Sequence, residues 1–295
     1  STAEKYVVLS PVEQGLIESL AVLFDTDTYQ TQAERSAAFI DITMALYEQY
    51  PDDIDVAFLA ADAIMMATPW DYFSSEDGRP INQADTAQAI LEKGMVQNPQ
   101  HPGLTHLHIH LMENSSTPEQ AESSADRLES LTPKAGHMVH MPGHIYMRVG
   151  RYSDAVATNE RSLAADQYFL EQWGDRPLPT GTTYGLSARV HAPHATNFIH
   201  WASVLQGTSP RAVDISKRMA NALTPERLGS NSGRRTLVNY WMTLRAFGRW
   251  QTIFETAKPS NSHPYLVGMW HFVRGSALMA EANSLIKPLE LLWLT

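Results

Sequence analysis

Two histidine pairs in the middle of the chain are spaced as helical metal ligands would be. His106 and His110 are four residues apart, and the same pair recurs 34 residues later as His140 and His144. Residues four apart lie on one face of a helix, and helical metal sites use this spacing. The pairs therefore predict a metal site to which two helices contribute.

Two neighbours extend each pair. His137 precedes His140 by three residues, and Glu113 follows His110 by three. A spacing of three also keeps side chains on one helix face. If the protein is an enzyme, we expect Glu113 either to bind the ion or to take a proton from metal-bound water. Glu113 is therefore the candidate catalytic residue.

The available donors restrict the metal. The chain has no cysteine, so its candidate ligands are imidazole and carboxylate. Such ligands suit zinc, copper, nickel or iron and do not distinguish between them. Such a site would support metal-assisted chemistry, and copper or iron would instead permit oxygen chemistry, so the sequence does not choose between hydrolysis and oxidation. Because there are more than four candidate ligands, we expect either two ions or one ion with outer groups that orient its ligands.

The segments that carry these residues are predicted to be helical. Ser10–Glu13 and Thr31–Glu34 are capping boxes, and Thr117–Gln120 has the same pattern. Apolar residues recur every three or four positions, with no pattern typical of a strand. The expected helices are 11–24, 33–49, 53–67, 84–97, 103–113, 118–131, 135–149, 152–169, 193–206, 210–222, 235–247 and 264–282. Two segments rich in glycine, proline and aromatics, 69–80 and 171–189, interrupt this rhythm.

The period of 34 residues resembles the tetratricopeptide repeat (TPR). The positions that carry the resemblance are the small, aromatic, glycine-turn and alanine positions of the consensus: Gly143, Tyr146, Gly150, Tyr152 and Ala155, with Pro133 closing the preceding unit. The clearest units are 102–135, 136–169 and 193–226. The sequence departs from the consensus at Ala125 and Asn159, where the family usually has an aromatic residue.

This resemblance implies an all-α fold, an α-solenoid of antiparallel helix pairs in a right-handed superhelix. We expect residues 1–295 to form one array and to be a piece of a longer one. The chain also resembles a bacterial subgroup of such proteins with a histidine-rich groove, on its HPG…H…IH…E and GH..HMP.HIY stretches. That subgroup resemblance implies no particular activity.

In the TPR family the first helix of each unit lines a concave groove, so the resemblance implies that the histidines face that groove. His194 occupies the same unit position as His137, and we expect its ring within about 10 Å of His140 or His144, close enough for one ion and a bridging water to span. The expected metal ligands are His106, His110, His137, His140, His144, Glu113 and His194. The expected pocket wall is Trp70, Asp71, Tyr146, Asn197 and Trp201.

A second interpretation is an adaptor without catalysis, whose groove holds a peptide or protein partner. Peptide grooves of this family would be expected to use lysine, arginine and asparagine to hold a terminal carboxylate. The corresponding positions here are histidine and glutamate, which favours a metal site and a small-molecule substrate. The net charge of −10 argues against nucleic acid as a partner. With no apolar run of bilayer-spanning length we expect a soluble protein, and its compartment stays open.

Overall fold

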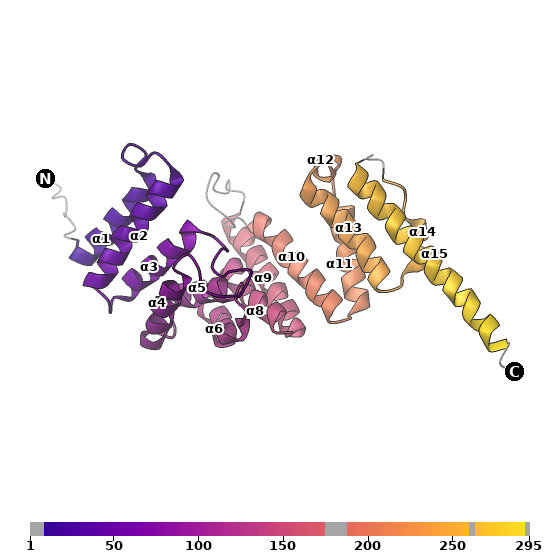
Figure 1. Cartoon of the computed structure of the whole chain (residues 1–295), viewed down its shortest axis with the longest axis horizontal. Helices are drawn as coiled ribbons and strands as arrows, with labels where there is room; N and C mark the ends of the chain where they lie inside the picture. Colours follow the sequence, from indigo (N-terminus) through magenta and orange to yellow (C-terminus); the bar gives the residue numbers. More distant parts are fainter. Residues whose placement is uncertain (1–8, 175–187, 260–262, 293–295) are drawn as a thin grey trace. The chain divides into compact units, whose positions relative to one another are not determined.

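The computed structural model describes residues 9–174, 188–259 and 263–292, and within these ranges the protein is all-helical (Figure 1). The one pairing of extended backbone among these residues is an isolated antiparallel bridge between Phe73 and Pro80. The all-α prediction is therefore confirmed. None of the described helices is long and apolar enough to cross a membrane.

Ten α-helices and two short 3-10 helices precede residue 206 in the described part of the chain. They are α1 (Pro11–Ala21), η1 (Val22–Phe24), α2 (Gln32–Gln49), α3 (Ile54–Ala67), α4 (Ala84–Gln97), α5 (Pro102–Met112), η2 (Pro118–Ala121), α6 (Glu122–Leu131), α7 (Gly136–His140), α8 (Pro142–Arg148), α9 (Tyr152–Trp173) and α10 (Ala188–Leu205). The later helices are α11 (Ser209–Asn221), α12 (Pro225–Leu228), α13 (Asn231–Ala246), α14 (Trp250–Glu255) and α15 (Pro264–Leu292).

Local sequence signals explain most of the helix starts. The capping boxes at Ser10 and Thr31 both form, with the hydroxyl and the third-residue glutamate exchanging hydrogen bonds with the backbone. The third predicted box is wrong. Thr117 makes no side-chain cap, and its own N–H donates to the Ser115 hydroxyl, so Pro118 begins a short 3-10 helix instead.

Several features of the helices differ from the sequence-based boundaries, among them the start of α10 at Ala188 and the end of α15 at Leu292. The short helices α12 and α14 were not predicted, because a segment of four to six residues shows no helical period. Helix α9 continues to Trp173, into the second predicted interruption, and residues 175–187 of that interruption lie outside the described part of the chain.

The chain divides into two compact units, Ser1–Ala195 and Thr196–Thr295. In the second unit, α13, α14 and α15 share a core of buried apolar side chains: Val238, Trp241, Leu244, Ile253, Leu266, Val273 and Ala277. In the first unit, α5 lies among α3, α4, α6 and α8, and α9 packs against both α7 and α8. Helix α5 therefore holds its side chains between several neighbours, and it carries two of the predicted ligands.

A long connection between α3 and α4 runs beside α5. Its chain folds back on itself, with the Ser74 N–H donating to the Arg79 carbonyl at 2.8 Å and the Ile81 N–H to the Tyr72 carbonyl at 2.9 Å. The described part of the chain has three non-glycine residues with positive φ, and all three belong to this connection: Trp70, Asn82 and Gln83. Left-handed backbone is costly for side chains other than glycine, so this connection is strained.

Candidate metal centre

Six histidines from α5, α7, α8 and α10 form two adjacent groups. We define the first triad as His106, His110 and His137, and the second triad as His140, His144 and His194. Within each triad one ligand atom per residue can be chosen so that all three lie within 4.8 Å of one another. Each triad therefore has the donors and the size to hold one metal ion. Both belong to the first compact unit.

The first triad joins two helices. His106 and His110 stack one turn apart on α5, with ring centroids 4.6 Å apart. His137, near the start of α7, brings its Nε2 to 3.1 Å from the Nε2 of His106. Two nitrogens held at ~2.0–2.1 Å from one ion lie roughly 2.9–3.4 Å apart for bond angles between about 90° and 109°. The measured separation lies in that range.

The second triad is closed by α10. The Nε2 atoms of His140 and His144 lie 2.8 Å apart, close to the same range. The His194 ring centroid is 4.6 Å from that of His140 and 5.8 Å from that of His144. The structure thus places His194 within the distance predicted from its position in the repeat, and a third helix contributes to this triad.

Glu113 connects the two triads. It is the C-terminal cap of α5, and its Oε1 accepts a hydrogen bond from His110 Nδ1 at 2.9 Å. Its Oε2 contacts the Nδ1 of His144. Burial alone would raise the pKa of the Glu113 carboxyl, but the hydrogen bonds from these two imidazoles and their charges hold it well below its usual range. The carboxylate is therefore ionised and can only accept.

His140 is oriented in the same way by an asparagine. Its Nδ1 lies 2.6 Å from Oδ1 of Asn159 on α9. The Nδ2 of Asn159 donates to the Ala155 carbonyl at 2.8 Å, which fixes the amide so that Oδ1 faces the ring. Because an amide oxygen only accepts, the proton of a neutral His140 lies on Nδ1.

These partners determine which ring nitrogens of the second triad face one another. Glu113 and Asn159 hold the Nδ1 protons of His144 and His140, so in the neutral rings both Nε2 atoms present lone pairs to each other. Two lone pairs 2.8 Å apart repel unless a proton or a metal ion lies between them. Metal-binding histidines in proteins are oriented by the same kind of outer hydrogen bond.

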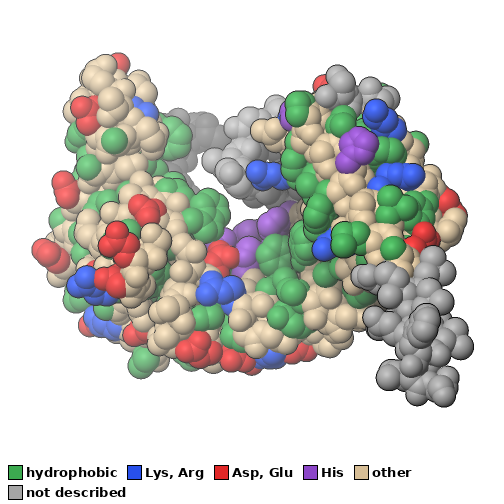
Figure 2. All heavy atoms as spheres, turned by 45° about the vertical axis from the view of Figure 1, so that its right-hand side comes forward, with side chains coloured by type: hydrophobic (Ala, Val, Ile, Leu, Met, Phe, Trp, Pro, Cys, Tyr) green, Lys and Arg blue, Asp and Glu red, His purple; other side chains and the backbone are tan. Residues whose placement is uncertain are grey.

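The electrostatics of the first triad also disfavour a proton. Burial lowers the pKa of His106 well below its usual value, and the neighbouring imidazoles of His110 and His137 lower it further. A neutral ring keeps its lone pair available for a metal. Histidine side chains, drawn purple, reach the surface together near the middle of Figure 2.

The local backbone explains how α7 and α8 present three of these rings. Pro142 has no N–H, and the helix is interrupted at Met141 between α7 and α8, as predicted from the proline inside this segment. The His144 N–H then bonds the Met141 carbonyl at 3.1 Å, a tighter turn than in an α-helix. At the start of α7, Gly136 leaves room for the Asp166 carboxylate, which a Cβ would overlap.

Trp70, the first residue predicted for the pocket wall, lies beside the first triad. The Trp70 ring meets the His110 ring edge-on, with centroids 6.4 Å apart, and 53% of the residue is exposed. The Asn114 side-chain amide donates a hydrogen bond to the Trp70 carbonyl. This bond joins the connection between α3 and α4 to the residue that follows Glu113. Asp71 accepts hydrogen bonds from Asn82 through its carbonyl and its carboxylate, so it stabilises the connection itself.

The other three residues predicted for the pocket wall have their own partners. The Tyr146 hydroxyl donates to Asp126 of α6 at 2.9 Å, and its ring lies under the guanidinium of Arg151, the residue before α9. Asn197 and Trp201 belong to the second compact unit. Trp201 is an exposed side chain whose ring lies 4.9 Å from that of His200. A pocket wall formed by these three residues stays a prediction.

Sequence reasoning missed two residues of the site. Asn159 departed from the repeat consensus, and that departure was its signal. Asp62 is a partly buried acid in the mostly apolar α3, where Asp55 in the first turn is the other charge, and its signal was a charge inside the apolar run that follows Asp55. Burial raises the pKa of Asp62 to about 6, and the charge of His110 partly counteracts this. Asp62 therefore lies close enough to the first triad to interact with its charge.

Comparison of the chain with known proteins adds no family to this geometry, since no protein-family model and no curated protein matches it.

Proposed function

We propose that this protein binds two transition-metal ions, one in each histidine triad, and uses them for catalysis on a small molecule. The observation that carries the proposal is the pair of Nε2 atoms of His140 and His144, 2.8 Å apart, whose Nδ1 protons are directed outward to Asn159 and Glu113. A merely polar groove has no need of two facing lone pairs. A metal ion between them satisfies both.

Three imidazoles per ion support a catalytic rather than a structural site. Structural zinc sites are closed by four protein ligands, whereas catalytic sites keep three and leave a position for water or substrate. Six imidazole nitrogen donors fit zinc, copper, nickel or iron, and copper lies highest in the order of divalent affinities. The metal decides the reaction class: bound zinc or nickel supports hydrolysis by activated water, and copper or iron supports oxidation.

In this proposal Glu113 orients the ligands. Both of its carboxylate oxygens already accept from imidazoles, one from each triad. An outer carboxylate of this kind fixes the ring, selects the tautomer and raises the basicity of the ligand nitrogen. The role of Glu113 as a base toward metal-bound water is thereby less favoured than its role as the shared support of both ions.

We also propose that α5 to α9 are two consecutive TPR-like units of an α-solenoid. The contacts of α5 with α6, of α8 with α9, and of α5 and α6 with α8 support this, as does the 34-residue offset between the histidine pairs. In such an array successive first helices lie ~8–10 Å apart, close enough for their imidazoles to share one cluster. Superposition of residues 102–135 on residues 136–169 in an experimental structure tests this assignment.

The metal content of the purified protein tests the function. We expect about two transition-metal ions per chain after expression without chelator, identified by elemental analysis and by anomalous scattering at the absorption edges. Replacing both His110 and His144 with alanine removes one ligand from each triad and should abolish retention while the helical circular-dichroism signal is kept. The matched control is His271→Ala, an exposed histidine of α15.

The possible results separate the interpretations. Unchanged metal content in the double variant would show that the triads are not the ligands. A wild-type protein that takes up no zinc, copper, nickel or iron would support the peptide-binding adaptor. The single variants His110→Ala and His144→Ala distinguish one ion from two. If the wild type holds one ion per chain and only one of these variants loses it, the metal belongs to the triad of that residue and the two-ion centre is rejected.

A further inference from the structure

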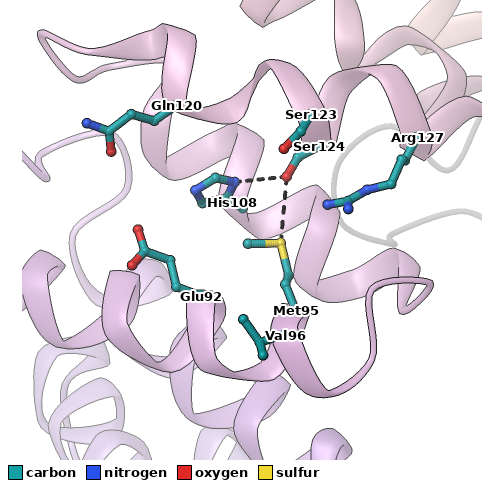
Figure 3. Close-up of a pocket in the computed structure, with 8 residues that line it drawn as sticks. All are labelled: Glu92, Met95, Val96, His108, Gln120, Ser123, Ser124 and Arg127. Carbon is teal, nitrogen blue, oxygen red and sulfur yellow. Dashed lines mark hydrogen bonds between the residues drawn. The ribbon is translucent and has the colours of Figure 1, made fainter.

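A pocket lies beside α5, and the residues that line it are not part of the metal centre. His108 is two residues from both His106 and His110, which places it on the opposite side of the helix from the triads. The pocket has a volume of about 280 Å³ and lies between α4, α5 and the segment formed by η2 and α6 (Figure 3). Its lining residues are Glu92, Met95, Val96, His108, Gln120, Ser123, Ser124 and Arg127.

His108 presents an unpaired nitrogen to this pocket. The residue is 4% exposed, and its Nδ1 lies 2.9 Å from the Ser124 hydroxyl. That hydroxyl donates to the Met95 sulfur at 3.6 Å, so Nδ1 carries the proton and Nε2 is an acceptor. Nε2 is buried and has no hydrogen-bond partner. Buried polar atoms in proteins are nearly always paired, so this nitrogen requires a donor from outside the chain.

Two opposite charges line the pocket on the two sides of the His108 ring. Figure 3 shows Nε2 of His108 directed toward the side of the pocket where the Glu92 carboxylate and the Gln120 amide lie. Arg127 lies on the other side of the His108 ring, beyond Ser124, and its guanidinium extends from α6 toward the pocket (Figure 3). Its buried Nε also lacks a partner.

We propose that this pocket binds a small zwitterion that carries a primary ammonium group and a carboxylate, such as an amino acid. The ammonium group donates to His108 Nε2 and to the Glu92 carboxylate, and the carboxylate of the ligand pairs with the Arg127 guanidinium. Each charge of the ligand then meets its opposite, and the two unpaired buried atoms gain partners. The volume is at the lower end of the ~300–1,000 Å³ of small-molecule sites, which fits a ligand of this size.

γ-Aminobutyrate is the first probe, with butylamine and butyrate as analogues that keep only one of its charges. The experiment uses the full chain in EDTA, so that the result does not depend on the metal centre. Calorimetry gives the affinities, and the ¹⁵N shift of His108 Nε2 reports the hydrogen bond. We expect the zwitterion to bind at least about tenfold more tightly than either analogue and to move the Nε2 resonance. Glycine and β-alanine then measure the preferred separation of the two charges.

Variants assign the contacts. Glu92→Gln should weaken γ-aminobutyrate about tenfold and leave butyrate unchanged, whereas Arg127→Gln should weaken γ-aminobutyrate similarly and leave butylamine unchanged. Glu119→Gln, an exposed residue of η2 outside the lining, is the control of equal charge change. Because Glu92 is exposed, its replacement does not endanger the fold.

Three results would overturn the proposal. The first is equal affinity for γ-aminobutyrate and for its single-charge analogues. The second is a His108 Nε2 resonance that no probe moves, which would mean that the pocket holds only water. The third is an affinity for γ-aminobutyrate that neither Glu92→Gln nor Arg127→Gln changes. None of these would affect the metal-content experiment, so the two proposals fail separately.

Discussion

Replacing Glu113 with glutamine is the sharpest test of the shared carboxylate. The carboxylate accepts from His110 through one oxygen and from His144 through the other. Glutamine has one oxygen and one NH₂ group, so it can accept from only one of the two rings. The other ring then faces a donor, and its proton must move from Nδ1 to Nε2. A histidine with a protonated Nε2 cannot bind the ion through that atom.

The size of the effect follows from the loss of one oriented ligand. Removal of an outer partner typically weakens metal binding about 10- to 100-fold, which corresponds to roughly 1.4–2.7 kcal/mol. We expect the loss to fall mainly on one of the two ions, since glutamine still supports one triad. Glu113→Ala, which supports neither, should weaken both.

Competition with a chromophoric chelator measures the two affinities separately, and Glu119→Gln serves as the control for the change of charge. If Glu113→Gln weakens neither ion, the carboxylate does not select the tautomers and the reasoning is wrong. If Glu113→Gln and Glu113→Ala weaken both ions equally and completely, Glu113 is itself a ligand of each.

Three further predictions concern the surroundings of the site. Trp70 lies against His110, so Cu²⁺ binding should quench the fluorescence of Trp70. Trp70→Phe should remove most of this quenching while the affinity for the metal changes little. Equal quenching in the variant would place the ion elsewhere. Burial lowers the pKa of His200 to about 4, below the ~6.5 of the unfolded chain, so its contribution to stability is present above pH 6.5 and is lost as the pH falls toward 4. We expect His200 to account for about 2 kcal/mol of the loss of unfolding free energy of its unit between pH 7 and pH 4, measured by urea unfolding. A His200→Asn variant whose stability depends on pH as strongly as that of the wild type would contradict this. A Cβ at Gly136 would overlap the Asp166 carboxylate, so Gly136→Ala should cost about 1–3 kcal/mol in thermal or urea unfolding, and Asp166→Ala in the same chain should recover part of it; a neutral Gly136→Ala would show that the carboxylate moves aside freely.

The helices were predictable because their signals are local. A hydrophobic period and a capping box act within one or two turns, so the starts of α1 and α2 could be predicted from sequence. Thr117 shows the limit, since a neighbouring hydroxyl at Ser115 competed for the backbone and replaced the expected cap. The division into two compact units depends on packing between distant segments, which no local pattern encodes.

The candidate site was predictable where the repeat carried it. The fixed offset between the histidine pairs brought His194 into the prediction although a long insertion precedes it, and the structure places its ring beside His140. The supports of the site were harder to predict. Asn159 and Asp62 come from other helices, and no regular spacing in the sequence relates them to the histidines. Only packing reveals that Asn159 bonds the His140 ring and that Asp62 interacts with the charge of His110.

The left-handed backbone at Trp70, Asn82 and Gln83 implies a trade-off between stability and function. Left-handed backbone costs Trp70 and Gln83 roughly 1–2 kcal/mol each that glycine would not lose, and it costs Asn82 less because asparagine tolerates this conformation. A chain selected for stability alone would accumulate glycines in this connection. Glycine at position 70, however, would also remove the indole that stands beside His110. The connection between α3 and α4 is thus a place where thermostabilising substitutions should be easy to find and should tend to damage whatever reaction the neighbouring histidines support.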